Sequence, residues 1–417
     1  MNYTFAGCDT VQLAQKYKTP LYLMSEDMIV DKIDEIKASF LNKYDNTLAY
    51  YASKAFLTLE MARIIKREGL GLDVVSGGEL YTAKMADFPM DMVMFHGNNK
   101  SPEEINMGLD YGVGHFVCDS LSEILLIEEL AEKQNKKAPI LIRVTPAVEA
   151  DTHKYISTGN EDSKFGVPLK NLEEIVKLCT GLGRINLKGF HFHVGSQLMD
   201  NSSHVAASKI LLKIIKNLKE KLNFITEELN IGGGFGIYYT KGDEPKRLSH
   251  FVDPVMEMIE SFCQANQIKR PKILIEPGRW IVGEAGITLY TVGSIKEIPG
   301  IRTYVGIDGG LPDNPRPALY EAVYEAVVAN KAEKELTDTV TIAGKCCESG
   351  DILIWDLKTP QLERGDILAV KATGAYNYSM ASNYNKIPKP PVVMIKDGID
   401  RLIVKRESFE DLLRNEI

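Results

Sequence analysis

The chain has 417 residues, of which 44% are hydrophobic and 25% charged, and its formal net charge is −8. This length is too great for one ordinary hydrophobic core and predicts two domains, one of them large. The acidic balance, with no basic tail, argues against nucleic acid as a main partner. No stretch approaches the about 20 apolar residues of a membrane span, and Met1–Phe5 lacks the features of a secretory signal. We therefore expect a cytoplasmic protein with no membrane partner.

Residues 27–280 alternate between short apolar runs and longer amphipathic ones, a pattern typical of an α/β fold. Eight strands separated by helices is the number that a (β/α)₈ barrel requires. An open doubly wound sheet would share this alternation, so periodicity alone does not decide whether the sheet closes. The expected strands are Thr47–Tyr51, Leu72–Val75, Met92–Phe95, His115–Cys118, Ile140–Val144, Leu187–Phe192, Glu228–Ile231 and Ile273–Ile275.

Residues 281–417 have a different pattern, with strand-length runs and few helical ones between them. This pattern predicts a β-rich second domain. Residues 1–26 are expected to join it, because Leu21–Leu23 is strand-like and precedes the first barrel helix. The expected strands are Thr288–Val292, Thr303–Ile307, Thr339–Ile342, Ile352–Trp355, Ile367–Val370, Val392–Ile395 and Arg401–Val404.

Lys54 follows the first expected barrel strand, in Ser53-Lys54-Ala55. A lone lysine is most often a solvated surface charge. In a barrel, however, functional residues gather at the C-terminal ends of the strands. A lysine held there away from water can lose its proton and form a Schiff base with a carbonyl group. Its position therefore makes Lys54 a candidate catalytic residue.

His191 and His193 lie two residues apart on the sixth expected strand, so both side chains should leave the same face. One interpretation is a metal pair, but the sequence contains no HExxH motif or other ligand cluster that would supply a third partner. We therefore predict no metal site. The remaining interpretations are hydrogen-bonded core histidines and an imidazole stacked on an aromatic cofactor.

A glycine-rich segment, Gly232-Gly233-Gly234-Phe235-Gly236, follows the seventh expected strand. Consecutive glycines let backbone N–H groups approach an anion closely, and barrels favour a phosphate site after strands seven and eight. The segment lacks the GK[ST] sequence of nucleoside triphosphate sites. A phosphate loop is therefore the favoured interpretation, and a glycine turn without a ligand is the alternative.

Glu276-Pro277-Gly278-Arg279 follows the eighth expected strand. The two charged residues could form a surface ion pair, but the rigid Pro-Gly link and the strand-end position favour two functional groups. A glutamate can hold a proton on a ring nitrogen, and an arginine can bind a carboxylate through two hydrogen bonds. Taken together, the lysine, the histidine, the glycine segment and this glutamate describe a site for pyridoxal 5'-phosphate.

Several motifs resemble those of the pyridoxal-phosphate-dependent decarboxylases with an alanine-racemase-like barrel, a family that includes ornithine and arginine decarboxylases. The motifs are Tyr51–Ala55, Leu72–Glu79, His96–Ser101, His193–Ser196 and Glu276–Arg279. The resemblance implies that Lys54 is the Schiff-base lysine, that His193 stacks on the ring and that Glu276 meets its nitrogen. The other cofactor-binding residues that it implies are Asp73, Glu79, Ser196, Gly233, Gly234 and Tyr376.

Further segments resemble the diaminopimelate decarboxylases within this family. They are Ile156–Gly159, Ser163–Gly166, Arg316–Tyr320, Cys347–Asp351 and Thr373–Tyr376. This resemblance implies decarboxylation of meso-2,6-diaminopimelate to L-lysine and CO₂, in lysine biosynthesis. It also implies a homodimer in which the Cys347 loop reaches the barrel of the other subunit. The substrate residues that it implies are Arg279, Arg316 and Tyr320 for the distal carboxylate, Glu348 for the distal ammonium, Cys347 near the reacting carbon and Tyr376 at the cofactor.

Other functions on the same scaffold are a decarboxylase of another basic amino acid or of carboxynorspermidine, a racemase, and a non-catalytic homologue that binds the cofactor. The Arg316–Tyr320 and Cys347–Glu348 segments weigh against another decarboxylase substrate. The presence of Lys54 weighs against a non-catalytic protein, and no second catalytic base for a racemase is identifiable. Two positions depart from the family pattern: Phe56 replaces a usual Asn, and Leu311-Pro312 replaces a usual Met-Asn.

The adjacent cysteines, Cys346 and Cys347, invite a redox interpretation. A disulfide between neighbouring residues is geometrically strained, and the cytosol is reducing. We therefore expect Cys346 to be structural and Cys347 to be functional.

Overall fold

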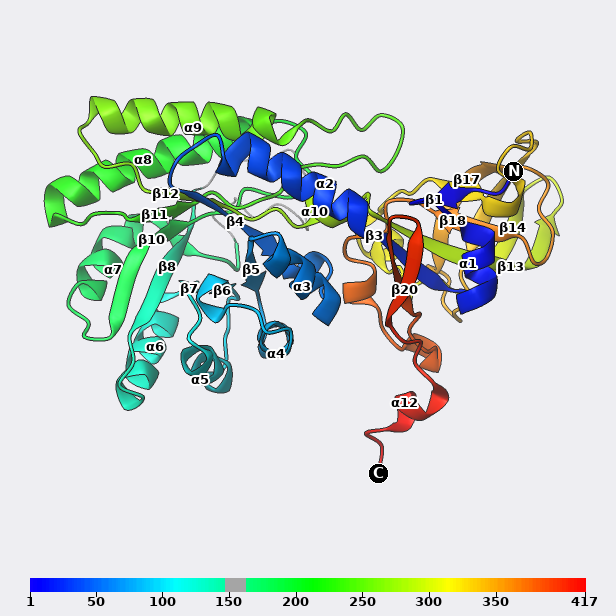
Figure 1. The fold of residues 1–417 in the computed structure, drawn as a ribbon, viewed down its shortest axis with the longest axis horizontal. Helices are drawn as coiled ribbons and strands as arrows, with labels where there is room; N and C mark the ends of the chain where they lie inside the picture. The colour runs from blue at the N-terminus through cyan, green and yellow to red at the C-terminus, as the bar shows by residue number, and fades with distance from the viewer. Residues whose placement is uncertain (147–162) are drawn as a thin grey trace. The chain divides into compact units, whose positions relative to one another are not determined.

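Eight parallel strands of the computed structural model, which describes residues 1–146 and 163–417, form a closed barrel. The ring closes where β8 pairs with β10, so the prediction of a (β/α)₈ barrel is confirmed (Figure 1). A short strand, β9 (Val167–Pro168), extends β8 outside the ring. The barrel strands are β4 (Thr47–Ala52), β5 (Gly71–Val74), β6 (Val93–Phe95), β7 (His115–Cys118), β8 (Ala138–Thr145), β10 (Ile185–His191), β11 (Glu228–Asn230) and β12 (Lys272–Ile275).

Three consecutive barrel helices begin in the same way, with a serine N-cap followed three residues later by glutamate. The hydroxyls of Ser76, Ser101 and Ser120 each accept a hydrogen bond from the backbone N–H three residues on. This satisfies an N–H group that the first helical turn would leave unpaired. The barrel helices are α3 (Leu59–Arg67), α4 (Gly77–Met85), α5 (Pro102–Tyr111), α6 (Leu121–Lys133), α7 (Leu172–Cys179), α8 (Ser202–Leu222) and α9 (Leu248–Ala265).

The middle of the barrel is filled by apolar side chains from alternate strand positions. Tyr50, Met94, Val117, Leu141 and Leu274 form one buried cluster. Because side chains alternate between the two faces of a strand, the positions two residues further along the same strands point to the same interior, beyond this apolar layer. The alternation therefore sends every second residue at the strand ends toward one shared site.

Three expected barrel strands end one residue earlier than the sequence indicates: β5 at Val74, β10 at His191 and β11 at Asn230. We expected Leu187–Phe192 to be extended, with His191 and His193 on one face, but β10 ends at His191 and His193 lies in the loop that follows. The argument from strand alternation therefore holds for His191 and does not place His193.

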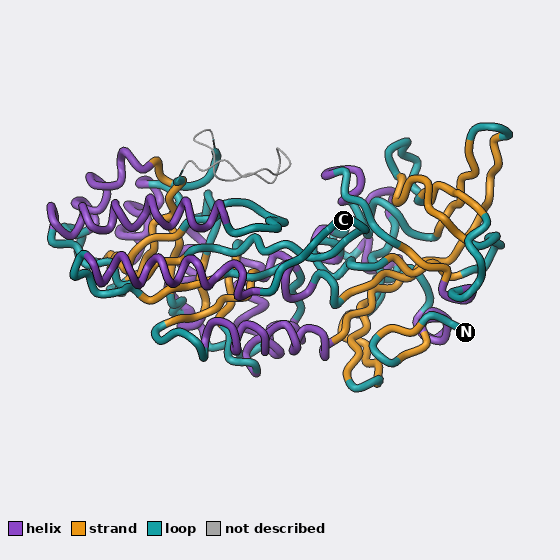
Figure 2. Tube along the Cα trace, turned by 90° about the horizontal axis from the view of Figure 1, so that it is seen from above, coloured by secondary structure: helices purple, strands orange, loops and turns teal. Residues whose placement is uncertain are grey.

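The second unit is β-rich, as predicted, and its sheet is centred on β13 (Gly286–Ile298), which is 13 residues long. Figure 2 shows the strands that dominate this unit and the helices that dominate the barrel. The prediction that Leu21–Leu23 joins this unit is confirmed, because β3 (Leu21–Ser25) pairs with β13 and β19. The other strands are β14 (Arg302–Ile307), β15 (Ala326–Val328), β16 (Asp338–Ala343), β17 (Ile352–Thr359), β18 (Ile367–Val370), β19 (Val392–Lys396) and β20 (Ile399–Val404).

Shorter elements complete the two units. The N-terminal hairpin and the first helix, α1, were not expected from the sequence, and neither was β15. Two helices lie where the units meet along the chain, α2 and α10. The remaining elements are β1 (Thr4–Phe5), β2 (Cys8–Asp9), α1 (Thr10–Tyr17), α2 (Glu26–Ile36), α10 (Arg279–Val282), α11 (Arg316–Tyr320) and α12 (Phe409–Leu413).

The two compact units are Ile33–Gly236 with Pro245–Trp280, and Met1–Lys32 with Ile237–Glu244 and Ile281–Ile417. The segment 237–244, which lies within the expected barrel range, thus belongs to the β-rich unit. Its Tyr238 hydroxyl donates to Glu325 at 2.7 Å. The β-rich unit therefore receives side chains from three separate parts of the chain.

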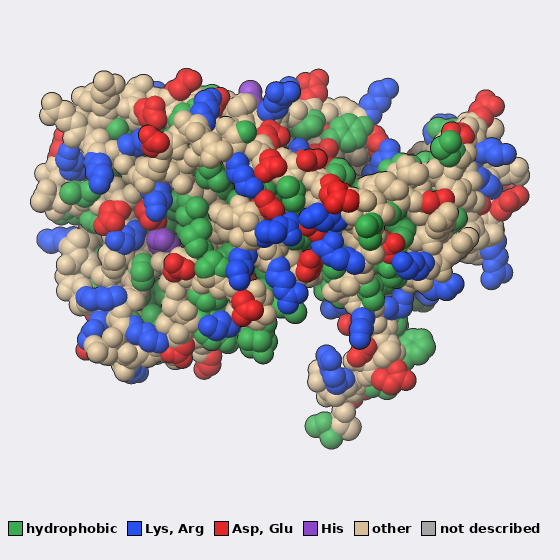
Figure 3. Space-filling model, in the orientation of Figure 1, with side chains coloured by type: hydrophobic (Ala, Val, Ile, Leu, Met, Phe, Trp, Pro, Cys, Tyr) green, Lys and Arg blue, Asp and Glu red, His purple; other side chains and the backbone are tan. Residues whose placement is uncertain are grey.

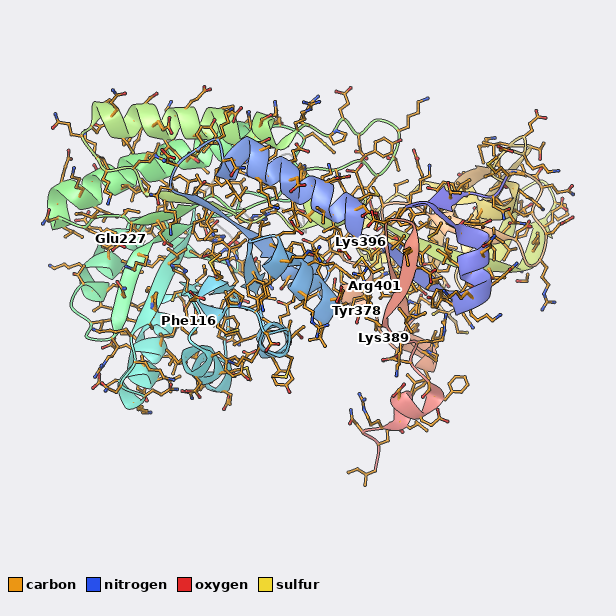
Figure 4. All side chains as sticks on the ribbon, viewed as in Figure 1. Phe116, Glu227, Tyr378, Lys389, Lys396 and Arg401 are labelled. Carbon is orange, nitrogen blue, oxygen red and sulfur yellow. The ribbon has the colours of Figure 1, made fainter. Side chains whose placement is uncertain are left out.

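Charged side chains of both signs are interspersed on the face shown in Figure 3. One acidic side chain, that of Glu26, is buried instead and is paired with two cations that remain accessible to solvent. Lys396 on β19 and Arg401 on β20, both labelled in Figure 4, pair with Glu26, whose side chain is 1% exposed. No helix in the described part of the chain is long and apolar enough to cross a membrane.

Candidate active site

The carboxyl end of the barrel carries Lys54 directly after β4, in a short 3-10 helix, Ser53–Ala55. The lysine side chain is exposed, and its charge lowers the pKa values of Asp73 and Glu79, although burial raises both more strongly. Glu79 also accepts hydrogen bonds from the Ser53 hydroxyl at 2.9 Å and from Val75 N at 2.7 Å. The structure therefore brings together the lysine and the two acids that the sequence analysis named.

Glu276, after β12, is the centre of a buried hydrogen-bond network. Its Oε1 lies 2.7 Å from His96 Nε2 and accepts from Asn230 Nδ2 at 2.7 Å. Its Oε2 lies 3.0 Å from His191 Nε2. Burial alone would raise the pKa of the Glu276 carboxyl, but the two histidines outweigh burial and hold it well below its usual value. We therefore take Glu276 as an anion.

Asp73, on β5, is the second buried carboxyl in this network. Its Oδ1 lies 3.7 Å from His96 Nε2 and has no hydrogen-bond partner in the described part of the chain. Burial is the main cause that raises the pKa of Asp73 to about 7; His96 opposes the shift and the neighbouring Glu276 adds to it. Asp73 thus offers a polar atom with no partner of its own at the carboxyl end of the barrel.

His193 and the glycine segment lie together beyond β10 and β11. Gly233 N donates weakly to His193 Nδ1, at 3.5 Å. Burial is the main cause that lowers the pKa of His193 well below its usual value, and the charge of Lys54 adds to it. His193 is therefore a neutral imidazole near the lysine, consistent with a ring that stacks on a cofactor.

Close contact with neighbouring backbone atoms requires glycine at two positions of the glycine segment. A Cβ atom on Gly233 would lie 2.1 Å from Glu276 O, and one on Gly234 would lie 2.2 Å from Gly195 O. Gly234 also has a φ of +94°, a conformation that favours glycine. The close packing of these backbones is therefore one physical reason for the segment, beside the phosphate-binding role expected from its position.

Arg279 lies beside Ser196, one of the residues expected to bind the phosphate group. Its Nη2 donates to the Ser196 hydroxyl at 3.1 Å, and the residue is 8% exposed. The sequence analysis assigned Ser196 to the phosphate and Arg279 to the substrate. The contact places both at the same end of the barrel, where a buried guanidinium favours an anion.

The barrel residues fit pyridoxal phosphate by their chemistry. They provide an amine, Lys54, an anionic carboxylate, Glu276, and a neutral imidazole, His193. They also provide a glycine cradle and a hydroxyl next to a guanidinium for the phosphate. The unpaired buried oxygen of Asp73 is a further polar atom that a bound group could satisfy.

Apart from Arg279, the residues expected to bind substrate belong to the β-rich unit. Arg316 opens α11 and is 8% exposed. Its Nη1 donates to Tyr324 Oη at 2.6 Å and to Tyr239 Oη at 3.3 Å, and the guanidinium lies 5.2 Å from the centre of the Tyr239 ring. In the described part of the chain Arg316 contacts hydroxyls and forms no ion pair, so it is a buried cation without a carboxylate partner.

Asp351 joins two loops of this unit. Its Oδ1 accepts from Leu311 N at 2.7 Å, in the loop that leads to Arg316, and its Oδ2 accepts from Cys346 N at 2.9 Å. Burial, with Asp351 adding to it, raises the pKa of the Cys346 thiol to about 12. Cys347 and Glu348 are exposed. One carboxylate therefore positions the Arg316 loop and the Cys347 loop relative to each other.

Tyr376 and Tyr320 are both partly buried. Tyr376 has a φ of +63°, which is uncommon for a residue other than glycine. The motif Ile156–Gly159 lies outside the described residues. Phe56, which departs from the family pattern, is 1% exposed, and its carbonyl accepts from the Tyr51 hydroxyl at 2.7 Å.

Several site residues were missed by the sequence analysis. His96 and Asn230 contact Glu276 although no role was assigned to either. The rule of strand ends could have found both, because His96 follows β6 and Asn230 ends β11. No pattern in the sequence marks Tyr239 and Tyr324 as partners of Arg316.

Comparisons with known proteins agree with this geometry. Residues 29–283 match the family model of the pyridoxal-dependent decarboxylases, pyridoxal binding domain. The chain is 47% identical over 98% of its length to the diaminopimelate decarboxylase of Bacillus subtilis, of which it covers 93%. It is 45% identical to that of Staphylococcus aureus, over 99% of this chain and 97% of the other. The solved diaminopimelate decarboxylase of M. jannaschii superposes with a TM-score of 0.93 at 35% identity, over 100% of this chain and 96% of that one.

The closed barrel and the match to the pyridoxal-binding family model define a barrel-fold decarboxylase that uses pyridoxal phosphate. At this identity and coverage, the chain belongs to the diaminopimelate decarboxylase family.

Proposed function

We propose that this enzyme decarboxylates meso-2,6-diaminopimelate, taking up one proton and releasing L-lysine and CO₂. The observation that carries the proposal is Arg316, a buried guanidinium that donates to two tyrosine hydroxyls. A buried charge without an opposite charge is costly. A substrate with a second carboxylate, at the end remote from the reacting carbon, would neutralise it.

The barrel residues would carry the reaction itself. Pyridoxal phosphate, when bound, supplies an electron sink for the bond between Cα and its carboxylate. Lys54 would hold the cofactor through a covalent link, His193 would stack on its ring, and Glu276 would keep a proton on its nitrogen. The phosphate would be bound by Ser196 and by the N–H groups of Gly233 and Gly234.

The β-rich unit would select the substrate. Arg316 and Tyr320, with Arg279 from the barrel, would bind the distal carboxylate, and Glu348 would bind the distal ammonium group. The thiol of Cys347 would deliver a proton to Cα after CO₂ has left. Lysine and ornithine lack the distal carboxylate, so their binding would leave the Arg316 charge unpaired, at a cost of about 2–5 kcal/mol.

We further propose a homodimer in which each Cys347 loop completes the site of the other subunit. The exposure of Cys347 and Glu348, together with the exposed Leu319 (53%) and Val323 (63%), supports a partner surface in this region. Tyr376 would contact the cofactor beside this loop.

The direct test is an assay of the cofactor-loaded enzyme with meso-2,6-diaminopimelate, measuring CO₂ and L-lysine, with ornithine and carboxynorspermidine as competitors. We expect one L-lysine for each CO₂ released. The kcat/KM for each competitor should be at least about tenfold below the kcat/KM for meso-2,6-diaminopimelate. Faster turnover of either competitor would replace the proposed substrate.

The shared site is tested by mixing two inactive proteins, Lys54→Ala and Cys347→Ala. With random subunit exchange about half the dimers are mixed, and each mixed dimer has one intact site, so about a quarter of wild-type activity should return. Exchange without recovered activity would exclude a shared site. The Cys346→Ala variant is the matched control and should stay active, because the Cys346 thiol is held by Asp351 and is not expected to donate the proton.

A further inference from the structure

Two histidine–glutamate pairs lie at opposite ends of the barrel. At the carboxyl end, His96 follows β6 and its Nε2 lies 2.7 Å from Glu276 Oε1. At the amino end, His115 begins β7 and its Nε2 lies 2.9 Å from Oε2 of Glu228, which begins β11. All four side chains are at most 12% exposed. The two pairs are alike in composition and burial, so their surroundings must distinguish their roles.

Glu276 is held by three donors, whereas a carboxylate offers roughly four acceptor positions. The Asn230 side chain is oriented by its own carbonyl oxygen, which accepts from Gly232 N at 2.9 Å, so its amide nitrogen faces Glu276. Burial lowers the pKa of His191 to about 4, so this ring is neutral and its Nε2–H donates to Glu276. One acceptor position on the carboxylate therefore remains for a further donor.

His96 lies between two carboxyl groups, at 2.7 Å from Glu276 and 3.7 Å from Asp73. A single Nε2–H can be donated well to only one of them, and the distances select Glu276. A buried carboxylate without donors takes up a proton. The position of His96 thus decides which of the two carboxyls is the anion.

We propose that His96 is a positioning residue for the ring-nitrogen site: its Nε2–H keeps Glu276 ionised and oriented, so that the remaining acceptor position of the carboxylate receives the protonated ring nitrogen of the cofactor. His191 and Asn230 complete this clamp. The inference rests on the role of Glu276 in the proposed function. Without the His96 donor, Glu276 would be a weaker partner for a protonated ring, and the ring would be a weaker electron sink.

The same three side chains, His96, His191 and Glu276, have potential ligand atoms within 4.8 Å of one another and so resemble a metal site. The histidine pair considered in the sequence analysis was His191 with His193, whereas this cluster joins His191 to His96 and Glu276. However, two ligands of a tetrahedral zinc ion lie roughly 3.3 Å apart, as follows from bond lengths of about 2.0 Å. The separations of 2.7 and 3.0 Å are those of hydrogen bonds, which favours the clamp.

The test uses the cofactor-loaded enzyme with pyridoxal phosphate labelled with nitrogen-15 in its ring. The chemical shift of that nitrogen reports its protonation without any turnover. In His96→Leu we expect the signal to move toward the unprotonated ring, with kcat lowered by about 10- to 100-fold and KM changed less. His96→Gln retains an N–H donor close to the position of Nε2, so it should restore the signal in part.

His115→Leu is the matched control, because it breaks the other buried pair. It should lower the melting temperature and leave the nitrogen signal and kcat as in the wild type. A wild-type nitrogen signal in His96→Leu would overturn the inference, and so would the same change of signal in His115→Leu. Bound metal in one-to-one amount in the wild type, lost in His96→Leu, would also overturn it.

Glu276→Gln separates this inference from the proposed function. If Glu276→Gln retains the signal of a protonated ring, the proposed role of Glu276 is wrong. If Glu276→Gln loses that signal and His96→Leu retains it, Glu276 has its proposed role and only the inference about His96 fails. If His96→Leu does not bind the cofactor, His96→Met, which also lacks an N–H donor, decides in its place: a wild-type signal overturns the inference, and a shift toward the unprotonated ring supports it.

Discussion

The two ends of the barrel are built from similar residues but differ in how those residues are neutralised. At the amino end, one carboxylate, Glu228, lies 2.9 Å from His115 Nε2 and 3.8 Å from Lys272 Nζ. At the carboxyl end, two buried carboxyls, Asp73 and Glu276, share His96, and one oxygen of Asp73 has no partner in the described part of the chain. Both ends keep buried polar atoms without a hydrogen-bond partner in the described part of the chain, and His115 Nδ1 is one of them at the amino end. The ends therefore differ in charge: one carboxylate has two basic neighbours at the amino end, whereas two carboxyls share one histidine at the carboxyl end.

The apolar layer between the ends makes this difference possible. Val117 lies two residues after His115 on β7, and Met94 lies two residues before His96. Val117 and Met94 both belong to the buried apolar cluster, which separates the polar groups at the two ends. The amino end can therefore stabilise the fold while the carboxyl end keeps an arrangement that is poor for stability and suited to chemistry.

The largest effect is expected at Lys54. Lys54→Ala removes the amine that would link the cofactor, so kcat should fall by roughly 10³-fold or more, as for other covalent catalysts. Borohydride reduction of the wild-type enzyme followed by peptide mapping should label Lys54. A label on another lysine would show that Lys54 is not the residue that links the cofactor.

The two glutamates give the sharpest contrast. Glu276→Gln should lower kcat by about 10²- to 10³-fold, because it removes charge stabilisation at the reacting centre. Glu228→Gln should leave kcat unchanged and lower the melting temperature, because it breaks a buried pair. Steady-state kinetics and thermal unfolding of both variants measure these effects, and equal kinetic losses would remove the distinction between the ends.

Arg316→Lys tests whether substrate choice is separate from the cofactor chemistry of the barrel. Lysine keeps the charge but not the planar donors of arginine, so kcat/KM for diaminopimelate should fall by about 10- to 100-fold. The dissociation constant of the cofactor should be unchanged. Arg302→Lys is the matched control in the same unit, since Arg302 bonds Thr341 at 2.6 Å and lies over Trp355, and it should keep full kcat/KM.

The smallest effect concerns pH. Burial raises the pKa of Asp73 to about 7, above the value of the unfolded chain. The folded protein therefore holds this proton more tightly than the unfolded chain does. The resulting contribution to the free energy of unfolding is fully present below about pH 4 and is lost as the pH rises through 7. In the cofactor-free protein, the free energy of unfolding should fall in this range by up to about 1.4 kcal/mol per pH unit. Asp73→Asn should therefore flatten the decrease of melting temperature between pH 5 and 8.

Glu228 should behave in the opposite way. Although burial raises its pKa, His115 lowers it more, so the stability that Glu228 contributes is present above its ordinary pKa and is lost on acidification. Glu228→Gln should thus reduce the loss of stability that the wild type shows on acidification through the ordinary pKa range of glutamate. Melting curves that change alike in the two variants would contradict the assigned difference.

The sequence predicted much of the fold because the spacing of apolar residues follows from the local geometry of strands and helices. The strands β7 and β18 begin and end where the apolar patterns do, at His115–Cys118 and Ile367–Val370. The strand-end rule also identified Lys54, Glu276 and the glycine segment, since chain alternation alone indicates which residues follow each strand. The end of β10 was less predictable, because tertiary hydrogen bonds decide where a strand stops.

Other features depend on contacts between distant residues, which no local pattern contains. Closure of the barrel required the pairing of β8 with β10, and an open sheet would have had the same periodicity. The Arg316 site required Tyr239, from a segment inside the barrel range, and Tyr324. The network around Glu276 joins His96, His191 and Asn230 from three separate strand ends.

By itself, therefore, the sequence determined the α/β class, the strand ends that carry chemistry and, through its motifs, the family. The tertiary structure decided that the sheet closes, that Glu276 receives three donors while Asp73 retains an unpaired oxygen, and that Arg316 is buried among hydroxyls. The physical reason is that side-chain alternation is a property of each strand, whereas neutralisation of a buried charge depends on which strands the fold places side by side.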